Sequence, residues 1–144
     1  MKIKTARIED IRKICELYAA QMKDLGETPP HNLESLIRKY WDKQIWFLFY
    51  DAHDFAFGMA YAVEQIVYSL GKVGYYIGGA FILPEWRGRG LYRQAMNQIE
   101  SWAKDRGAVE LFARIRDDND HSIKSLLAFG WHKVKYGNYV KALQ

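Results

Sequence analysis

The sequence has few of the residues that build disulfide frameworks, metal sites or exported precursors. Cys15 is its one cysteine among 144 residues, and three prolines and four histidines are present. A single cysteine excludes an intramolecular disulfide, and the histidines lack metal-ligand spacing, so we expect no metal. The opening Met-Lys-Ile-Lys is not a signal-peptide run, and no segment approaches the roughly 20 apolar residues of a membrane span. We therefore expect a soluble, cytoplasmic protein with no membrane partner.

The chain also lacks a linker and a strong charge imbalance. No stretch rich in proline, glycine or serine divides it, so we expect a single domain over residues 1–144. The 21 basic and 17 acidic residues leave a net charge of +4. An excess of this size is usual for a solvated surface, and we expect no nucleic-acid partner. Apolar residues make up 49% of the chain, which is enough for one shared core.

What the chain does have is apolar periodicity. Spacings of three and four residues predict four amphipathic helices, at residues 8–25, 33–41, 91–106 and 120–129. Asn32 and Asn119 are expected to cap the second and fourth of them. Gly26, Gly107 and Gly130 are expected to end the first, third and fourth.

Runs rich in aromatic and branched residues predict strands between these helices. They lie at residues 2–7, 45–51, 55–67, 74–83 and 109–116, with a closing hairpin of 131–136 and 138–143 linked by Gly137. The third helix lies between two strands, and such a crossover makes those strands parallel. The predicted class is α+β, a mixed and mostly antiparallel sheet flanked by helices on both faces, in the order β-α-α-β-β-β-α-β-α-β-β.

The segment PEWRGRGLYRQAM, residues 84–96, joins a predicted strand to a predicted helix. A helix amino terminus leaves about four backbone amides unpaired and carries a partial positive charge, which suits a phosphate. Gly88 and Gly90 let an anion approach those amides, and Arg87 and Arg89 add charge-assisted contacts. The alternative is that the glycines only permit a tight turn and the arginines are solvated. The strand before the turn and the helix after it favour the phosphate site.

This segment and a second one, NDHSIKSLLAFGW at residues 119–131, resemble the two signature segments of the GNAT superfamily of acyl-CoA-dependent N-acyltransferases. Arg87, Gly90 and Tyr92 fall on the specified positions of the first pattern, Q/R-x-x-G-x-G/A. The second pattern is matched, or replaced with similar residues, at Asn119, Ser122, Gly130 and Trp131. The resemblance covers nearly the whole chain. It implies a GNAT-like fold and an enzyme that moves an acetyl group from acetyl-CoA to a primary amine by direct attack in a ternary complex.

The resemblance also implies where the co-substrate binds. The exposed backbone of Ala80, Phe81 and Ile82 would bind the pantetheine arm like an added strand and offer an amide to the thioester oxyanion. The pyrophosphate would lie on the amides of Arg87, Gly88, Arg89, Gly90, Leu91, Tyr92 and Arg93. The family usually has glycine or alanine where Tyr92 stands, so this ring either lies along the coenzyme or packs against its helix. Asn119 either contacts the coenzyme arm or only caps its helix.

The positions at which the family usually holds its acid and base have other residues here. They are occupied by Leu126, Gly78-Gly79 and Arg114. Glu64 and Asp117 remain candidate bases, with a surface carboxylate as the alternative for each. Candidate proton donors, with packing as the alternative, are Tyr75, Tyr76, Tyr136 and Tyr139. The glycine pair instead suggests a β-bulge where the acetyl group and the amine approach the backbone, so that proximity and the oxyanion contact supply most of the rate.

Two functions therefore stay open. The first is the N-acetyltransferase, with acetyl-CoA as co-substrate and an amine that the sequence does not identify. That amine would enter between the coenzyme strand and the loops at residues 26–32 and 136–139, past Tyr40, Trp41 and Tyr136. The alternative is a coenzyme A-binding module with little or no turnover. We expect a monomer or a homodimer.

Overall fold

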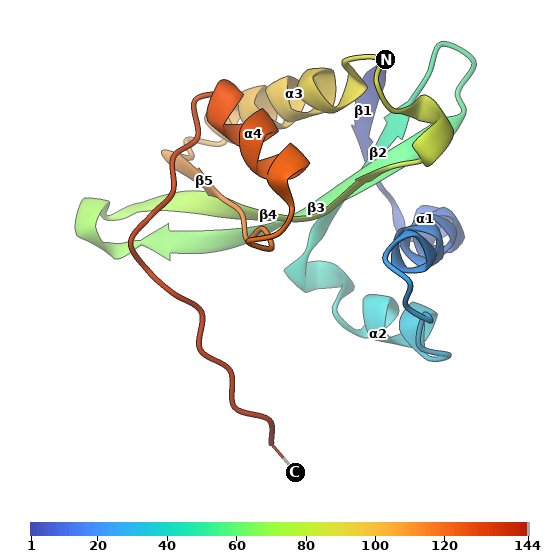
Figure 1. The fold of residues 1–144 in the computed structure, drawn as a ribbon, viewed down its shortest axis with the longest axis horizontal. Coiled ribbons are helices and arrows are strands. Elements are labelled where there is room, and N and C mark those ends of the chain that lie inside the picture. Colours follow the sequence, from blue (N-terminus) through green and yellow to red (C-terminus); the bar gives the residue numbers. More distant parts are fainter. Residues whose placement is uncertain (144) are drawn as a thin grey trace. The chain divides into compact units, whose positions relative to one another are not determined.

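The computed structural model describes residues 1–143. Its contacts divide the chain into an amino-terminal unit, residues 1–113, and a carboxy-terminal unit from Arg114 onward. The amino-terminal unit holds one five-stranded sheet in the order β1-β2-β3-β4-β5 (Figure 1). The strands are β1 (Lys2–Thr5), β2 (Ile45–Tyr50), β3 (Ala56–Val67), β4 (Lys72–Ile82) and β5 (Glu110–Phe112). The first four pair antiparallel and β5 pairs parallel to β4, which confirms the mixed, mostly antiparallel sheet.

Helices cover both faces of this sheet, as predicted. Successive side chains of a strand point to opposite faces, so in β2 Trp46 and Leu48 face one way and Phe47 faces the other. Helices α1 (Ile11–Asp24) and α2 (Leu33–Lys39) pack against the face with Trp46 and Leu48, which we call the α1 face. Helix α3 (Leu91–Asp105) covers the opposite, α3 face (Figure 1). On that face the ring of Trp102 lies 4.9 Å from that of Phe47.

Burial is concentrated in the strands of this unit. Phe47, Phe57 and Met59 are fully buried, as are Ile14 of α1 and Ile99 of α3. Burying a side chain of this size contributes roughly 1.5–3 kcal/mol. These two packed layers fix the positions of β3 and β4.

Strands β3 and β4 change register near their middle. Met59 pairs with Phe81, but Tyr61 pairs with Gly78, so two residues of β4, Gly79 and Ala80, stand opposite one residue of β3. Gly79 has a φ of +59°, a left-handed conformation that favours glycine. The predicted β-bulge is therefore present, and it bends β4 where the chain approaches the glycine-arginine turn.

Strand β5 is much shorter than expected. The sequence predicted residues 109–116, but the strand spans Glu110–Phe112 and pairs only with the β4 residues Gly74, Tyr75 and Tyr76. Within residues 1–143, the edge of β4 beyond Tyr76 that faces away from β3 has no strand partner. Unpaired strand edges bind extended ligands readily.

The carboxy-terminal unit contains α4 (Asp120–Ala128) and an irregular tail. The side chain of Asn119 caps α4, and Gly130, with a φ of +89°, ends it, as predicted. The predicted hairpin of residues 131–136 and 138–143 is wrong, because residues 131–143 form neither helix nor strand. Tyr136 and Tyr139 are 87% and 96% exposed, and a two-stranded hairpin that buries so little apolar surface is marginal in water.

Two local expectations for α2 also need correction. Asn32 stands at its N-cap position, but the Asn32 side chain makes no capping bond; instead the Ser35 hydroxyl donates to the Asn32 carbonyl at 2.9 Å. The expected apolar stripe is only partly used, because Ile37 is buried while Leu36 and Tyr40 are exposed. None of the helices within residues 1–143 has the length and apolar content needed to span a bilayer.

Candidate functional site

The glycine-arginine turn leaves β4 through a short 3-10 segment, Pro84–Trp86, and enters α3 at Leu91. Gly88 and Gly90 have φ angles of +76° and +71°, so the backbone itself requires glycine at both. A Cβ atom on either residue would meet nothing within 4 Å. The two glycines therefore leave open space in front of the turn, as a ligand would need.

The backbone donors of this turn separate into two groups. The amides of Trp86 and Arg87 donate to the carbonyls of Leu83 and Pro84. The first bond along α3 runs from the Gln94 amide to the Gly90 carbonyl at 3.2 Å. The segment between Arg87 and Gln94 thus forms the positive end of the α3 dipole, where an anion is stabilised.

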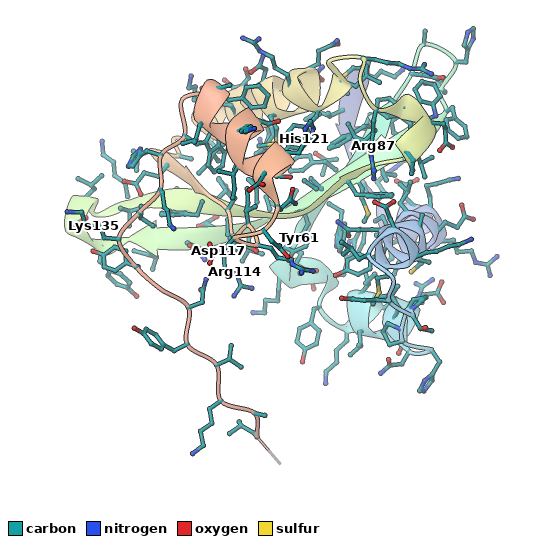
Figure 2. The ribbon with its side chains drawn as sticks, in the orientation of Figure 1. Tyr61, Arg87, Arg114, Asp117, His121 and Lys135 are labelled. Atoms are coloured by element: carbon teal, nitrogen blue, oxygen red, sulfur yellow. The ribbon has the colours of Figure 1, made fainter. Side chains whose placement is uncertain are left out.

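Both arginines of the turn contact protein groups in this structure. Arg87 donates from Nε to the Ile82 carbonyl at 3.0 Å and from Nη2 to the Asp24 carboxylate at 2.9 Å, which ties the end of β4 to the end of α1 (Figure 2). Arg89 donates to the Glu85 carbonyl at 2.9 Å. The Arg87–Asp24 pair is about half exposed, and such pairs contribute at most about 1 kcal/mol, so a phosphate can compete for the guanidinium.

The backbone polar groups of Ala80, Phe81 and Ile82, the expected pantetheine-binding residues, do not all face the open edge of β4. The Leu83 amide donates to the Phe57 carbonyl of β3, so by alternation the polar backbone groups of Phe81 also face β3. Those of Ala80 and Ile82 then face the open edge. Two side chains already contact that edge, since Gln21 of α1 donates to the Ala80 carbonyl at 3.5 Å and Arg87 donates to that of Ile82.

The bulge lies under the ring of Tyr61, a residue that the sequence analysis did not single out. A Cβ atom on Gly78 would lie 2.5 Å from Cζ and 2.6 Å from the hydroxyl oxygen of Tyr61. On Gly79 it would lie 3.0 Å from two carbons of the same ring. The Tyr61 ring therefore packs directly on the backbone of Gly78 and Gly79. The Gly78-Gly79 dipeptide indicates from the sequence that something packs closely here. That the packing residue is Tyr61 follows only from the register of β3 against β4.

Of the candidate acid/base groups in this unit, only one lies near the bulge. Tyr76 is on the α1 face, with its ring 6.2 Å from that of Tyr61. Glu64 pairs with Tyr75, whose ring packs 4.7 Å from Trp102 on the α3 face. Burial first, and then the Glu64 carboxylate, raise the pKa of the Tyr75 phenol. Glu64 and Tyr75 thus lie on the face opposite Tyr61 and Tyr76.

The remaining expected residues belong to the carboxy-terminal unit. The Asn119 side-chain carbonyl accepts the Ser122 amide at 3.2 Å, so its capping role is present. Asp117 is exposed, and Arg116 pairs with the neighbouring Asp118 at 2.9 Å. Leu126, at the family's usual tyrosine position, is buried.

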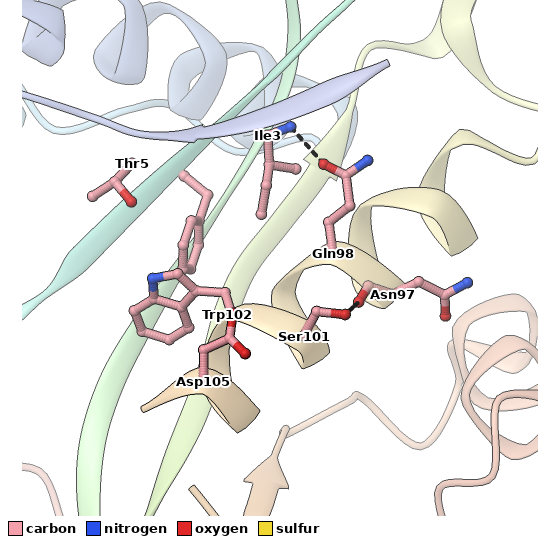
Figure 3. A pocket seen from close by; sticks show the side chains of 8 residues that line it. Ile3, Thr5, Asn97, Gln98, Ser101, Trp102 and Asp105 are labelled. Carbon is pink, nitrogen blue, oxygen red and sulfur yellow. Dashed lines mark hydrogen bonds between the residues drawn. The ribbon is translucent and has the colours of Figure 1, made fainter. Parts of the chain in front are cut away.

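A cavity of about 450 Å³ lies on the α3 face, between β1 and α3 (Figure 3). One of the side chains that line it, Gln98, accepts the Ile3 amide at 2.9 Å and donates to the Met1 carbonyl at 3.3 Å. Trp102 lines the same cavity, and its indole nitrogen is buried without a hydrogen-bond partner among the described residues. The polar contacts made by Gln98 hold β1 against α3, which is a structural role.

The comparisons with known proteins agree with this architecture. The model of the acetyltransferase (GNAT) family matches residues 11–131. A probable acetyltransferase of known structure superposes with a TM-score of 0.88 at 15% identity, covering 100% of this chain and 99% of that one. A predicted acetyltransferase from Clostridium acetobutylicum, solved with acetyl-CoA, gives a TM-score of 0.78 at 14% identity, covering 97% and 95% of the two chains. At these identities the structures show the fold alone.

One curated relative adds a sequence match. An aminoglycoside N(6')-acetyltransferase type 1 from Acinetobacter genomosp. 13 is 30% identical over 66 residues, which is 46% of this chain and 45% of that protein. The match thus spans less than half of the relative's length. Taken with the family model, which covers most of the chain, the fold and the turn place this chain in the GNAT family of acetyltransferases.

Proposed function

We propose that the protein transfers an acetyl group from acetyl-CoA to a primary amine, by direct attack of the amine while both substrates are bound. The observation that carries the proposal is the turn at Gly88 and Gly90, with positive φ angles and open space before it, at the amino end of α3. Acetyl-CoA supplies the activated acetyl group. The backbone amides from Gly88 to Arg93 and the guanidinium of Arg89 bind its pyrophosphate. The Arg87 amide, which the sequence analysis included in this set, already donates to the Pro84 carbonyl at 3.2 Å.

The open edge of β4 is the proposed track for the pantetheine arm. The backbone of Ala80 and Ile82 hydrogen-bonds the arm in the manner of an added strand. At the bulge, a backbone amide stabilises the negative charge that develops on the thioester oxygen. The amine loses a proton as it attacks, and the departing thiolate takes one up. Neither transfer is assigned to a side chain, and solvent serves for both where the substrates are held close together.

The second candidate function is a coenzyme A-binding module with little turnover. The observation that favours it is the buried Leu126 at the position where the family usually has a tyrosine. The two functions make the same prediction for binding and opposite predictions for catalysis. If the protein only binds coenzyme A, acetyl-CoA raises its melting temperature while thiol release with amines stays at background.

Titration calorimetry with acetyl-CoA, followed by a thiol-release assay with a panel of amines, tests the proposal. We expect binding, thiol release with some amines, and roughly tenfold weaker binding in Arg89→Glu, because this change places a negative charge beside the phosphate site. Arg12→Glu, the same charge change on an exposed residue of α1, is the matched control and should bind normally. Absence of acetyl-CoA binding would overturn both functions.

A further inference from the structure

Four aromatic side chains gather on the α1 face beside the bulge, and we call them the aromatic cluster: Tyr18, Trp46, Tyr61 and Tyr76. The ring of Trp46 lies 5.0 Å from that of Tyr61 and 6.3 Å from that of Tyr18, and Tyr61 lies 6.2 Å from Tyr76. Trp46 is 2% exposed, while the three tyrosines are partly exposed. The cluster therefore has a buried base and accessible rings, and the register places Tyr61 (labelled in Figure 2) beside the bulge of β4.

The backbone around the cluster is shaped to accommodate Tyr61. A side chain at Gly78 would occupy the position of the Tyr61 phenol, and one at Gly79 would press on its ring. Gln21 holds the adjoining Ala80 carbonyl from α1. The phenol therefore lies directly over the backbone segment that, under the proposed function, faces the reacting thioester.

The residues of β3 and β4 directly beside the bulge supply no charge to the α1 face. The side chains of β3 and β4 on this face beside the bulge are uncharged: Met59, Tyr61, Val63, Tyr76 and Phe81. Charged strand residues of the same face occur only farther along, at Lys72 of β4 and at Glu110 of β5, which pairs with Gly74. The nearest carboxylate of β3, Glu64, points to the opposite face, and Asp24 of α1 is paired with Arg87. A polycationic amino sugar carries several ammonium groups, each of which favours a carboxylate or a ring of polar acceptors.

We propose that the aromatic cluster is the acceptor subsite and selects a primary amine carried on a flat aromatic body. The inference rests on the proposed function and names the substrate class for it. Ring stacking against Tyr61 and Tyr76 fits such a body, and an aromatic face also attracts a single ammonium group before it loses its proton. The acceptor class differs from the aminoglycosides on which the curated relative acts by name.

Steady-state acetylation of three amines tests the subsite: 2-phenylethylamine, the aliphatic n-butylamine, and kanamycin as a polycationic sugar. We expect kcat/KM for 2-phenylethylamine to exceed that for n-butylamine by about tenfold, the usual size of a stacking contribution. In Tyr61→Ala the KM for 2-phenylethylamine should rise about tenfold while the KM for acetyl-CoA stays unchanged. Tyr61→Phe keeps the ring and should keep the low KM. Tyr68→Ala, which removes an 85% exposed ring at the tip of the β3–β4 hairpin, is the control.

Gly78→Ala provides a second test. This variant retains the Tyr61 residue, but the new methyl group pushes the Tyr61 ring away from the bulge. It should raise the KM for 2-phenylethylamine as Tyr61→Ala does, in protein whose melting curve stays cooperative. Turnover that favours kanamycin, or an aryl preference unchanged in both variants, overturns the subsite and leaves the proposed function intact. Failure of the wild-type chain to release thiol with any of the three amines and a wider panel overturns the proposed function, and the subsite with it.

Discussion

The turn and the bulge each contain a pair of glycines, and the two pairs are required for different reasons. Gly88 and Gly90 have left-handed backbone and open space where a side chain would be. At Gly78 the limit is space, because the Tyr61 ring fills the position of a Cβ atom. Gly79 combines a left-handed φ with contact to the same ring. One pair leaves room for a ligand, and the other leaves room for a side chain of the protein itself.

This difference separates two kinds of specificity. A turn whose amides are presented by backbone conformation binds any ligand with a suitable phosphate, whatever is attached to it. A bulge covered by an aromatic ring presents side-chain chemistry, which discriminates among acceptors. The co-substrate and the acceptor would thus be recognised by backbone and by side chains respectively.

The first test of this difference between the two glycine pairs is at Gly78, where we expect the largest effect on stability. Gly78→Ala should lower the free energy of unfolding by about 1–3 kcal/mol, because the new methyl group overlaps the Tyr61 ring. Denaturant titration measures the change.

A double-mutant cycle identifies the cause. In a Tyr61→Ala background the ring is gone, so the same Gly78→Ala change should cost much less, leaving a coupling energy of about 1 kcal/mol or more. Equal costs in the two backgrounds would mean that Gly78 is needed for its backbone and not for space.

Gly90 tests the other member of the comparison, a glycine required for its backbone conformation and not for space. Gly90→Ala should lower the free energy of unfolding by about 1–2 kcal/mol, since alanine in a left-handed conformation is strained although nothing crowds it. Gly90→Asn should cost less, because asparagine tolerates this conformation better than alanine. Thermal unfolding of the two variants checks the order. A larger loss in Gly90→Asn would indicate that crowding, and not φ, limits this position.

The features that sequence reasoning found are those with local causes. Gly26 and Gly130 end their helices because each residue alone can adopt the required φ. The strands from Ile45 to Ile82 follow from dense runs of aromatic and branched residues that bury on both faces. The turn at Gly88 and Gly90 was found because a strand, a glycine motif and a helix follow one another directly.

The features that it missed depend on partners far away in the chain. The pairing of Arg87 with Asp24, which is 63 residues earlier, had no local signal, and the role of Arg87 as a phosphate ligand stays a prediction. Tyr61 covers Gly78 only because the bulge shifts the register of β3 and β4. The alternation in residues 131–143 resembles two strands, yet a strand forms only where a neighbour pairs with it, and the structure gives these residues none.

The smallest expected effect concerns Tyr92, which stands beside the turn glycines. Burial raises the pKa of the Tyr92 phenol above its usual value of 10. A group whose pKa is raised on folding contributes stability that is complete below its unfolded pKa and is lost as pH rises through the folded pKa. The melting temperature should therefore fall above about pH 10, and it should fall less steeply in Tyr92→Phe, which has no phenol to ionise. Melting curves between pH 8 and about 11 measure both slopes. If the two slopes were identical, the Tyr92 phenol would titrate in the folded protein as it does in water, which would contradict the burial of this ring.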